Sequence, residues 1–123
     1  YVSNVNPPTF PDGMDVEVLN FKTLEKSWKK AKMRSEREGV TDYIVKNPKM
    51  FKSGNFARAE DISHLRLTLD EKEDMILIEK IYKELYEKDQ FFGLKDILKL
   101  FKEKPELIKI NQHIKRNEGS YEN

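Results

Sequence analysis

The chain has 123 residues, of which 23 are basic and 22 acidic, so its formal net charge is +1. That balance offers no global attraction to nucleic acid, and we expect no nucleic-acid partner. The sequence holds no cysteine, which excludes thiol catalysis, disulfides and cysteine zinc sites. It contains neither a signal peptide nor an apolar run of about 18 residues, so we expect a cytoplasmic protein without a membrane partner.

The first third of the chain predicts two strands and a helix. Residues 1–5 read as a strand, which suggests that a preceding part of the protein is missing. Residues 14–19 alternate, with Val16 and Val18 on one face, and predict a second strand. Asn20 is typical of a helix N-cap. The spacing of Leu24, Trp28 and Ala31 then predicts the buried stripe of the helix that follows.

The middle of the chain predicts a short helix within residues 35–44, ending before Asn47-Pro48. Residues 50–56 are expected to contain a short strand with a glycine bulge. Leucines alternate over residues 65–69 and predict a strand with one buried face. A helical period follows over residues 72–88.

The last third is predicted to be helical. Leu94, Ile97, Leu98 and Phe101 follow a helical spacing, and Pro105 suits the first turn of a final short helix. Residues 1–114 are expected to form part of a single domain, and residues 115–123 are expected to form a polar tail.

Asp70 stands where the predicted strand 65–69 gives way to a helix. The edge of an α/β sheet at which strands end is where ligands bind, and a carboxylate there can hold a magnesium ion that also carries phosphates. Spacing alone favours Asp70 as a helix N-cap, with Glu73 completing a capping box, because such caps are common. The two roles are compatible.

Three blocks in order resemble the spore-coat polysaccharide F-type cytidylyltransferases, relatives of the acylneuraminate and 3-deoxy-manno-octulosonate cytidylyltransferases. Residues 11–18 read Pro-Asp-Gly-Met-Asp-Val-Glu-Val, where the family has Pro-Asp-Gly-Leu-Asp-Val-Glu-Val. Residues 37–44 resemble the family's Arg-Glu-His-Val-Thr-Pro-Tyr-Ile, with Gly39 in place of histidine and Asp42 in place of proline. Residues 65–74 resemble its Leu-Arg-Trp-Thr-Val-Asp-Glu-Pro-Glu-Asp block.

This resemblance implies an α/β fold: the C-terminal part of a nucleotide-diphospho-sugar transferase fold, with a few-stranded mixed sheet and flanking helices. It implies transfer of CMP from CTP to a sugar acid with Mg²⁺, for surface polysaccharide synthesis. It implies that Asp70 binds the metal and that the chain forms a homodimer. The sugar pocket would be near Asp12, Gly13, Asp15 and Glu17, and the dimer contact near Arg37, Thr41, Tyr43 and Ile44.

The family's nucleotide-binding loop has no counterpart in this sequence, whose five glycines are scattered. We therefore expect the chain by itself to be inactive. The alternative hypothesis is a non-catalytic interaction or oligomerisation module, built on exposed strand edges and apolar surface.

Overall fold

A computed structural model describes residues 1–116 of the chain. They divide into two compact units. The first, called here the sheet unit, comprises residues 1–9 and 15–60. The second, the helical unit, comprises residues 10–14 and the chain from residue 61 onward.

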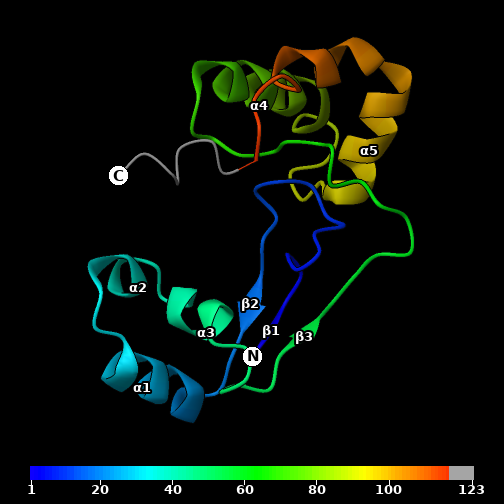
Figure 1. Cartoon of the computed structure of the whole chain (residues 1–123). Helices are drawn as coiled ribbons and strands as arrows, with labels where there is room; N and C mark the ends of the chain where they lie inside the picture. The colour runs from blue at the N-terminus through cyan, green and yellow to red at the C-terminus, as the bar shows by residue number, and fades with distance from the viewer. Residues whose placement is uncertain (117–123) are drawn as a thin grey trace. The chain divides into compact units, whose positions relative to one another are not determined.

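The sheet unit is built on three short strands, which Figure 1 labels. They are β1 (Val2–Ser3), β2 (Glu17–Val18) and β3 (Gly54–Asn55), in the order β2-β1-β3. The central strand β1 is antiparallel to β2 and parallel to β3. The three strands predicted in this part of the chain are therefore confirmed, each shorter than expected, and the sheet is mixed.

Three helices complete the sheet unit: α1 (Phe21–Lys30), α2 (Arg34–Glu38) and α3 (Asp42–Lys46). The predicted N-cap is confirmed, because the Asn20 side chain accepts a hydrogen bond from the N–H of Thr23 at 2.9 Å. The predicted burial of Trp28 is wrong, since this side chain is 64% exposed. Ser27 is buried in its place, whereas the predicted burial of Ala31 is confirmed, so the inward face of α1 passes through Ser27 and not Trp28.

The helical unit contains α4 (Lys72–Leu85), α5 (Leu94–Glu103) and the 3₁₀ helix η1 (Pro105–Ile110). All three were predicted, although α4 ends before residue 88. Their apolar faces pack with the loop before α4 into one core, made of Ile62, Leu65, Leu77, Ile81, Leu100, Phe101 and Leu107.

The predicted strand over residues 65–69 is wrong. The segment makes only a one-residue parallel bridge between Asp12 and Arg66. The N–H of Asp12 donates to the Leu65 carbonyl at 2.9 Å, and the N–H of Leu67 donates to the Asp12 carbonyl at 2.8 Å. The partner segment forms a tight turn, closed by the hydrogen bond from the Met14 N–H to the Pro11 carbonyl, so the pairing does not extend. Burial does not follow the alternation of the leucines, because Leu65 and Arg66 are both buried and Leu69 is 60% exposed.

No helix within residues 1–116 has the length and apolar character that crossing a membrane requires. The predicted polar tail, residues 115–123, falls mostly outside the described residues, so its boundary stays a prediction.

The core of the helical unit predicts how two neighbouring residues of α4 differ. Leu77 is 1% exposed, whereas Ile76 is 46% exposed. Leu77→Ala should lower the free energy of unfolding by about 2–5 kcal/mol, because it leaves a cavity in a packed core. Urea unfolding followed by circular dichroism measures this loss. Ile76→Ala is the matched control and should cost about 1 kcal/mol or less; equal losses would contradict the packing described here.

Candidate functional site

A buried arginine lies at the centre of the helical unit's polar cluster. Arg66 Nε and Nη2 donate to the two carboxylate oxygens of Asp74 at 3.0 and 2.9 Å. Arg66 Nη1 donates to Asp12 Oδ2 at 3.0 Å. All three residues are buried. The bidentate pair with Asp74 is the strongest geometry that an arginine and a carboxylate can adopt, and it fixes the guanidinium plane.

Asp74 gathers further donors at the start of α4. Its carboxylate accepts hydrogen bonds from Thr68 Oγ1 at 2.7 Å and from Asn111 Nδ2 at 2.8 Å. The N–H groups of Asp70 and Glu71 donate to it at 3.1 and 3.2 Å. Burial raises the pKa of Asp74, but the hydrogen bonds from Arg66, Thr68 and Asn111 outweigh burial and hold that pKa far below its usual range.

The Asp12-Gly13 turn is held against the segment that carries Arg66. Gly13 has a φ of +91°, and a Cβ atom at this position would lie 2.6 Å from the Leu67 carbonyl oxygen. Only glycine fits such a backbone conformation and such a close approach. The turn closes with a hydrogen bond from the Met14 N–H to the Pro11 carbonyl at 3.1 Å. Asp12 and Gly13 are therefore fixed in place relative to Arg66.

Asp70 differs from the other carboxylates because its side chain is 73% exposed, with Oδ2 3.5 Å from Arg66 Nη2. The predicted N-cap role of Asp70 with Glu73 is wrong. The cap is Glu71, and Asp74 is the residue whose side chain reaches back to the cap N–H, one position later than predicted. The Asp70 carboxylate therefore faces solvent beside the Arg66 guanidinium, which Asp12 and Asp74 already pair.

The remaining predicted site residues lie in the sheet unit. The Glu17 carboxylate accepts hydrogen bonds from the Tyr1 and Thr41 hydroxyls, the latter at 2.8 Å. Asp15 is exposed. The structure therefore gathers Asp12, Gly13 and Asp70 around Arg66, while Asp15 and Glu17 belong to another unit.

The predicted dimer contact spans α2 and α3. Ile44 has no exposed surface, and Thr41 is largely buried. Tyr43 packs edge-on against Phe51, with ring centroids 6.2 Å apart. Arg37 donates to the Ala31 carbonyl at 2.9 Å. Ile44 consequently serves the unit's own core in this conformation, and the dimer contact itself stays a prediction.

Within residues 1–116 no three histidine or acidic side chains come together as a ready metal site. Asp70 still fits one ligand position for Mg²⁺, since its carboxylate is exposed and magnesium is commonly bound by one or two carboxylates plus substrate phosphates. The other ligands would have to come from substrate or from further carboxylates.

Sequence reasoning missed Arg66, Asp74 and Asn111. The alternating leucines predicted that Arg66 lies on the solvent face of a strand. Arg66 is in fact buried, and a buried arginine requires acidic partners. Asp12 and Asn111 are 54 and 45 residues away from it along the chain, so no local spacing could reveal the cluster.

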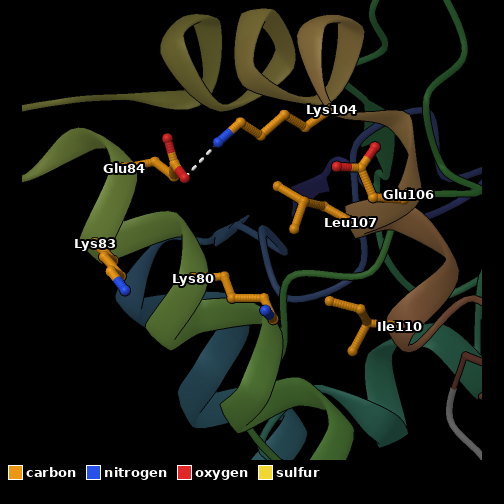
Figure 2. A pocket seen from close by; sticks show the side chains of 7 residues that line it. All are labelled: Lys80, Lys83, Glu84, Lys104, Glu106, Leu107 and Ile110. Atoms are coloured by element: carbon orange, nitrogen blue, oxygen red, sulfur yellow. Dashed lines mark hydrogen bonds and ion pairs between the residues drawn. The ribbon is translucent and has the colours of Figure 1, made fainter.

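A cavity of about 390 Å³ in the helical unit involves none of these residues. Figure 2 shows that Lys104 reaches across it to form an ion pair with Glu84. Three lysines and two glutamates share the lining with two apolar side chains, a mixture that favours no particular ligand. The lining residues are Lys80, Lys83, Glu84, Lys104, Glu106, Leu107 and Ile110.

Known proteins resemble this chain over most of its length. It is 28% identical to a solved cytidylyltransferase from Leptospira borgpetersenii and superposes with a TM-score of 0.80, covering 87% of this chain and 44% of that one. An uncharacterized protein of Methanocaldococcus jannaschii is 32% identical over 108 residues, which is 85% of this chain and 43% of the relative. No protein-family model matches.

The chain spans less than half the length of either relative. The fold predicted from the sequence is confirmed: the chain has the α/β fold of part of a cytidylyltransferase. The similarity to the Leptospira enzyme supports a relationship to cytidylyltransferases in general.

The Asp74 cluster predicts a specific response to acid. Because the pKa of Asp74 is depressed in the folded state, its stabilising contribution is present above the unfolded-state pKa of about 3.9 and is lost as the pH falls toward the folded value. Asp74→Asn should cost about 3–5 kcal/mol at neutral pH, since it unpairs a buried arginine. It should also flatten the pH dependence of unfolding below about pH 4.

Urea unfolding over a pH series measures both effects. Glu79→Gln, an exposed position on the same helix, serves as the control and should keep the acid dependence of the parent chain. An Asp74→Asn variant as acid-sensitive as its parent would show that Asp74 does not carry this effect.

Proposed function

We propose that this chain forms part of a cytidylyltransferase that transfers CMP from CTP to a sugar acid and releases pyrophosphate. The observation that carries the proposal is the similarity to the Leptospira cytidylyltransferase, which joins 28% identity to a TM-score of 0.80. The sequence blocks at residues 11–18, 37–44 and 65–74 support the spore-coat type and a role in surface polysaccharide synthesis. We place the reaction in the cytoplasm, where CTP is found.

The geometry suggests how the residues divide the work. Mg²⁺, when bound, would neutralise phosphate charge during transfer. Asp70 would hold it, because this carboxylate is exposed while Asp12 and Asp74 are committed to Arg66. Asp12 is buried, so it would position the turn rather than touch the sugar acid. The exposed backbone at Gly13 is the candidate sugar contact beside Asp70 in the helical unit.

Nucleotidyl transfer also needs a group that aligns the triphosphate with the attacking sugar hydroxyl. The five glycines of the sequence do not form a phosphate-binding loop. We propose that the triphosphate is held by a polypeptide equivalent to the part of the Leptospira enzyme that this chain does not match.

A chimera tests this function directly. In it, this chain replaces the matching region of the Leptospira cytidylyltransferase. With CTP, Mg²⁺ and a panel of sugar acids, the chimera should release pyrophosphate, whereas the isolated 123-residue chain should give no turnover. The intact Leptospira enzyme is the positive control. A correctly folded chimera without turnover on any sugar acid would contradict the proposal, and turnover by the isolated chain would refute the predicted inactivity.

Asp70 offers a second test in the same chimera. Asp70→Asn should keep the fold, because the side chain is exposed, and should lower kcat by about 100-fold or more at limiting Mg²⁺. The Mg²⁺ concentration for half-maximal rate should rise, since an amide lacks the charge that attracts the cation. Glu79→Gln is the matched control on α4. Unchanged turnover and Mg²⁺ dependence would remove Asp70 from the metal site.

The alternative is an oligomerisation module, for which the predicted homodimer is the simplest form. This alternative is supported by the exposed apolar side chains of the sheet unit, since exposed apolar surface often marks a protein-protein contact.

A further inference from the structure

The strand register of the sheet unit divides its side chains between two faces. Val2 lies opposite Val18 and Gly54, while Ser3 lies opposite Glu17 and Asn55. Residues directly opposite each other in paired strands point to the same side of a sheet. One face therefore carries valines and a glycine, and the other carries polar side chains.

The polar face is covered by this unit at its centre, while Glu17 and Asn55 stay exposed at its sides. Ser3 is only 3% exposed, and Glu17 is held by the hydroxyl of Thr41 at the start of α3. A cavity on this side is lined by Ser3 and Asn55 together with Ile44 and Val45 of α3. Helix α3 therefore packs over the polar side of the sheet.

The valine face is open. Val2 is 45% exposed and Val18 is 63% exposed, and Val16, two residues before Val18 on the same side of the segment, is 57% exposed. We call these three residues the valine face. In an isolated half-covered sheet the apolar face is the buried one, whereas here the apolar face is open. Sheets of α/β proteins are covered on both faces, so this one lacks a cover.

The lengths of the relatives indicate what the cover is. The Leptospira cytidylyltransferase and the Methanocaldococcus protein both continue well beyond the region that this chain matches, since the chain covers 44% and 43% of them. We propose that the valine face is the docking surface for a polypeptide equivalent to the remainder of the Leptospira chain. This inference rests on the proposed function and adds the surface through which the two parts of the enzyme join.

Because the sequence holds no cysteine, a single introduced cysteine reports the solvent accessibility of the valine face. Val18→Cys places one thiol on the valine face. Trp28→Cys is the control, because Trp28 lies on α1 with an almost equal exposure of 64%. Reaction of each thiol with a maleimide is followed by peptide mass spectrometry, in the isolated chain and in the chimera. In the chimera, the Val18→Cys thiol should react at least about tenfold more slowly than in the isolated chain, and the control within about twofold.

Equal reactivity of the Val18→Cys thiol in the isolated chain and in a folded chimera overturns the proposal. Slow reaction of this thiol already in the isolated chain also overturns the proposal. If its reaction rate then falls with rising protein concentration, a second copy of the chain covers the valine face. If the rate does not change with concentration, another part of the same chain covers it. If the chimera fails to fold, the remainder of the Leptospira enzyme is added as a separate polypeptide. Protection of the Val18→Cys thiol alone supports the proposal, and no protection overturns it.

The outcome is separable from the proposed function. Protection without CTP turnover keeps the docking surface and removes the activity, whereas turnover without protection keeps the activity and removes the docking surface.

Discussion

The buried guanidinium of Arg66 is the group on which the helical unit depends. A cation taken out of water is costly unless its charge and its donors are matched. Asp74 and Asp12 supply that match, and they come from α4 and from a turn 54 residues earlier in the chain. Because losing either partner would strand a buried charge, the turn, the segment before α4 and the first turn of α4 are held in one geometry.

The same cluster explains why Asp70 is available for other chemistry. Three carboxylates, Asp12, Asp70 and Asp74, lie near two guanidiniums, those of Arg66 and Arg116. One negative charge is left over, and it resides on the exposed member of the set. The two buried carboxylates satisfy Arg66, so the third can bind a cation without leaving an arginine unpaired. Structural and functional roles are thus divided among neighbouring aspartates.

Local patterns predicted the elements that local interactions determine. Asn20 caps α1, the apolar spacing from Leu94 specifies α5, and Pro105 begins η1, all as expected. The failures arise where distant residues decide. Residues 65–69 have a strand's alternation but only Asp12 to pair with, so no strand forms. The donors around Asp74 include Asn111, which no spacing connects to it.

Alternation identifies two faces of a strand but does not say which one the protein covers. In β2 the sequence correctly separates the valines from Glu17, and the natural inference is that the valines are inside. The structure joins Glu17 to Thr41 at the start of α3 by a hydrogen bond and leaves the valines without a partner element among residues 1–116. A row of exposed valines is informative, because burying apolar side chains away from water is favourable and such a row is expected to be covered in the complete protein. The valine face and the unmatched length of the relatives therefore point to the same missing contact.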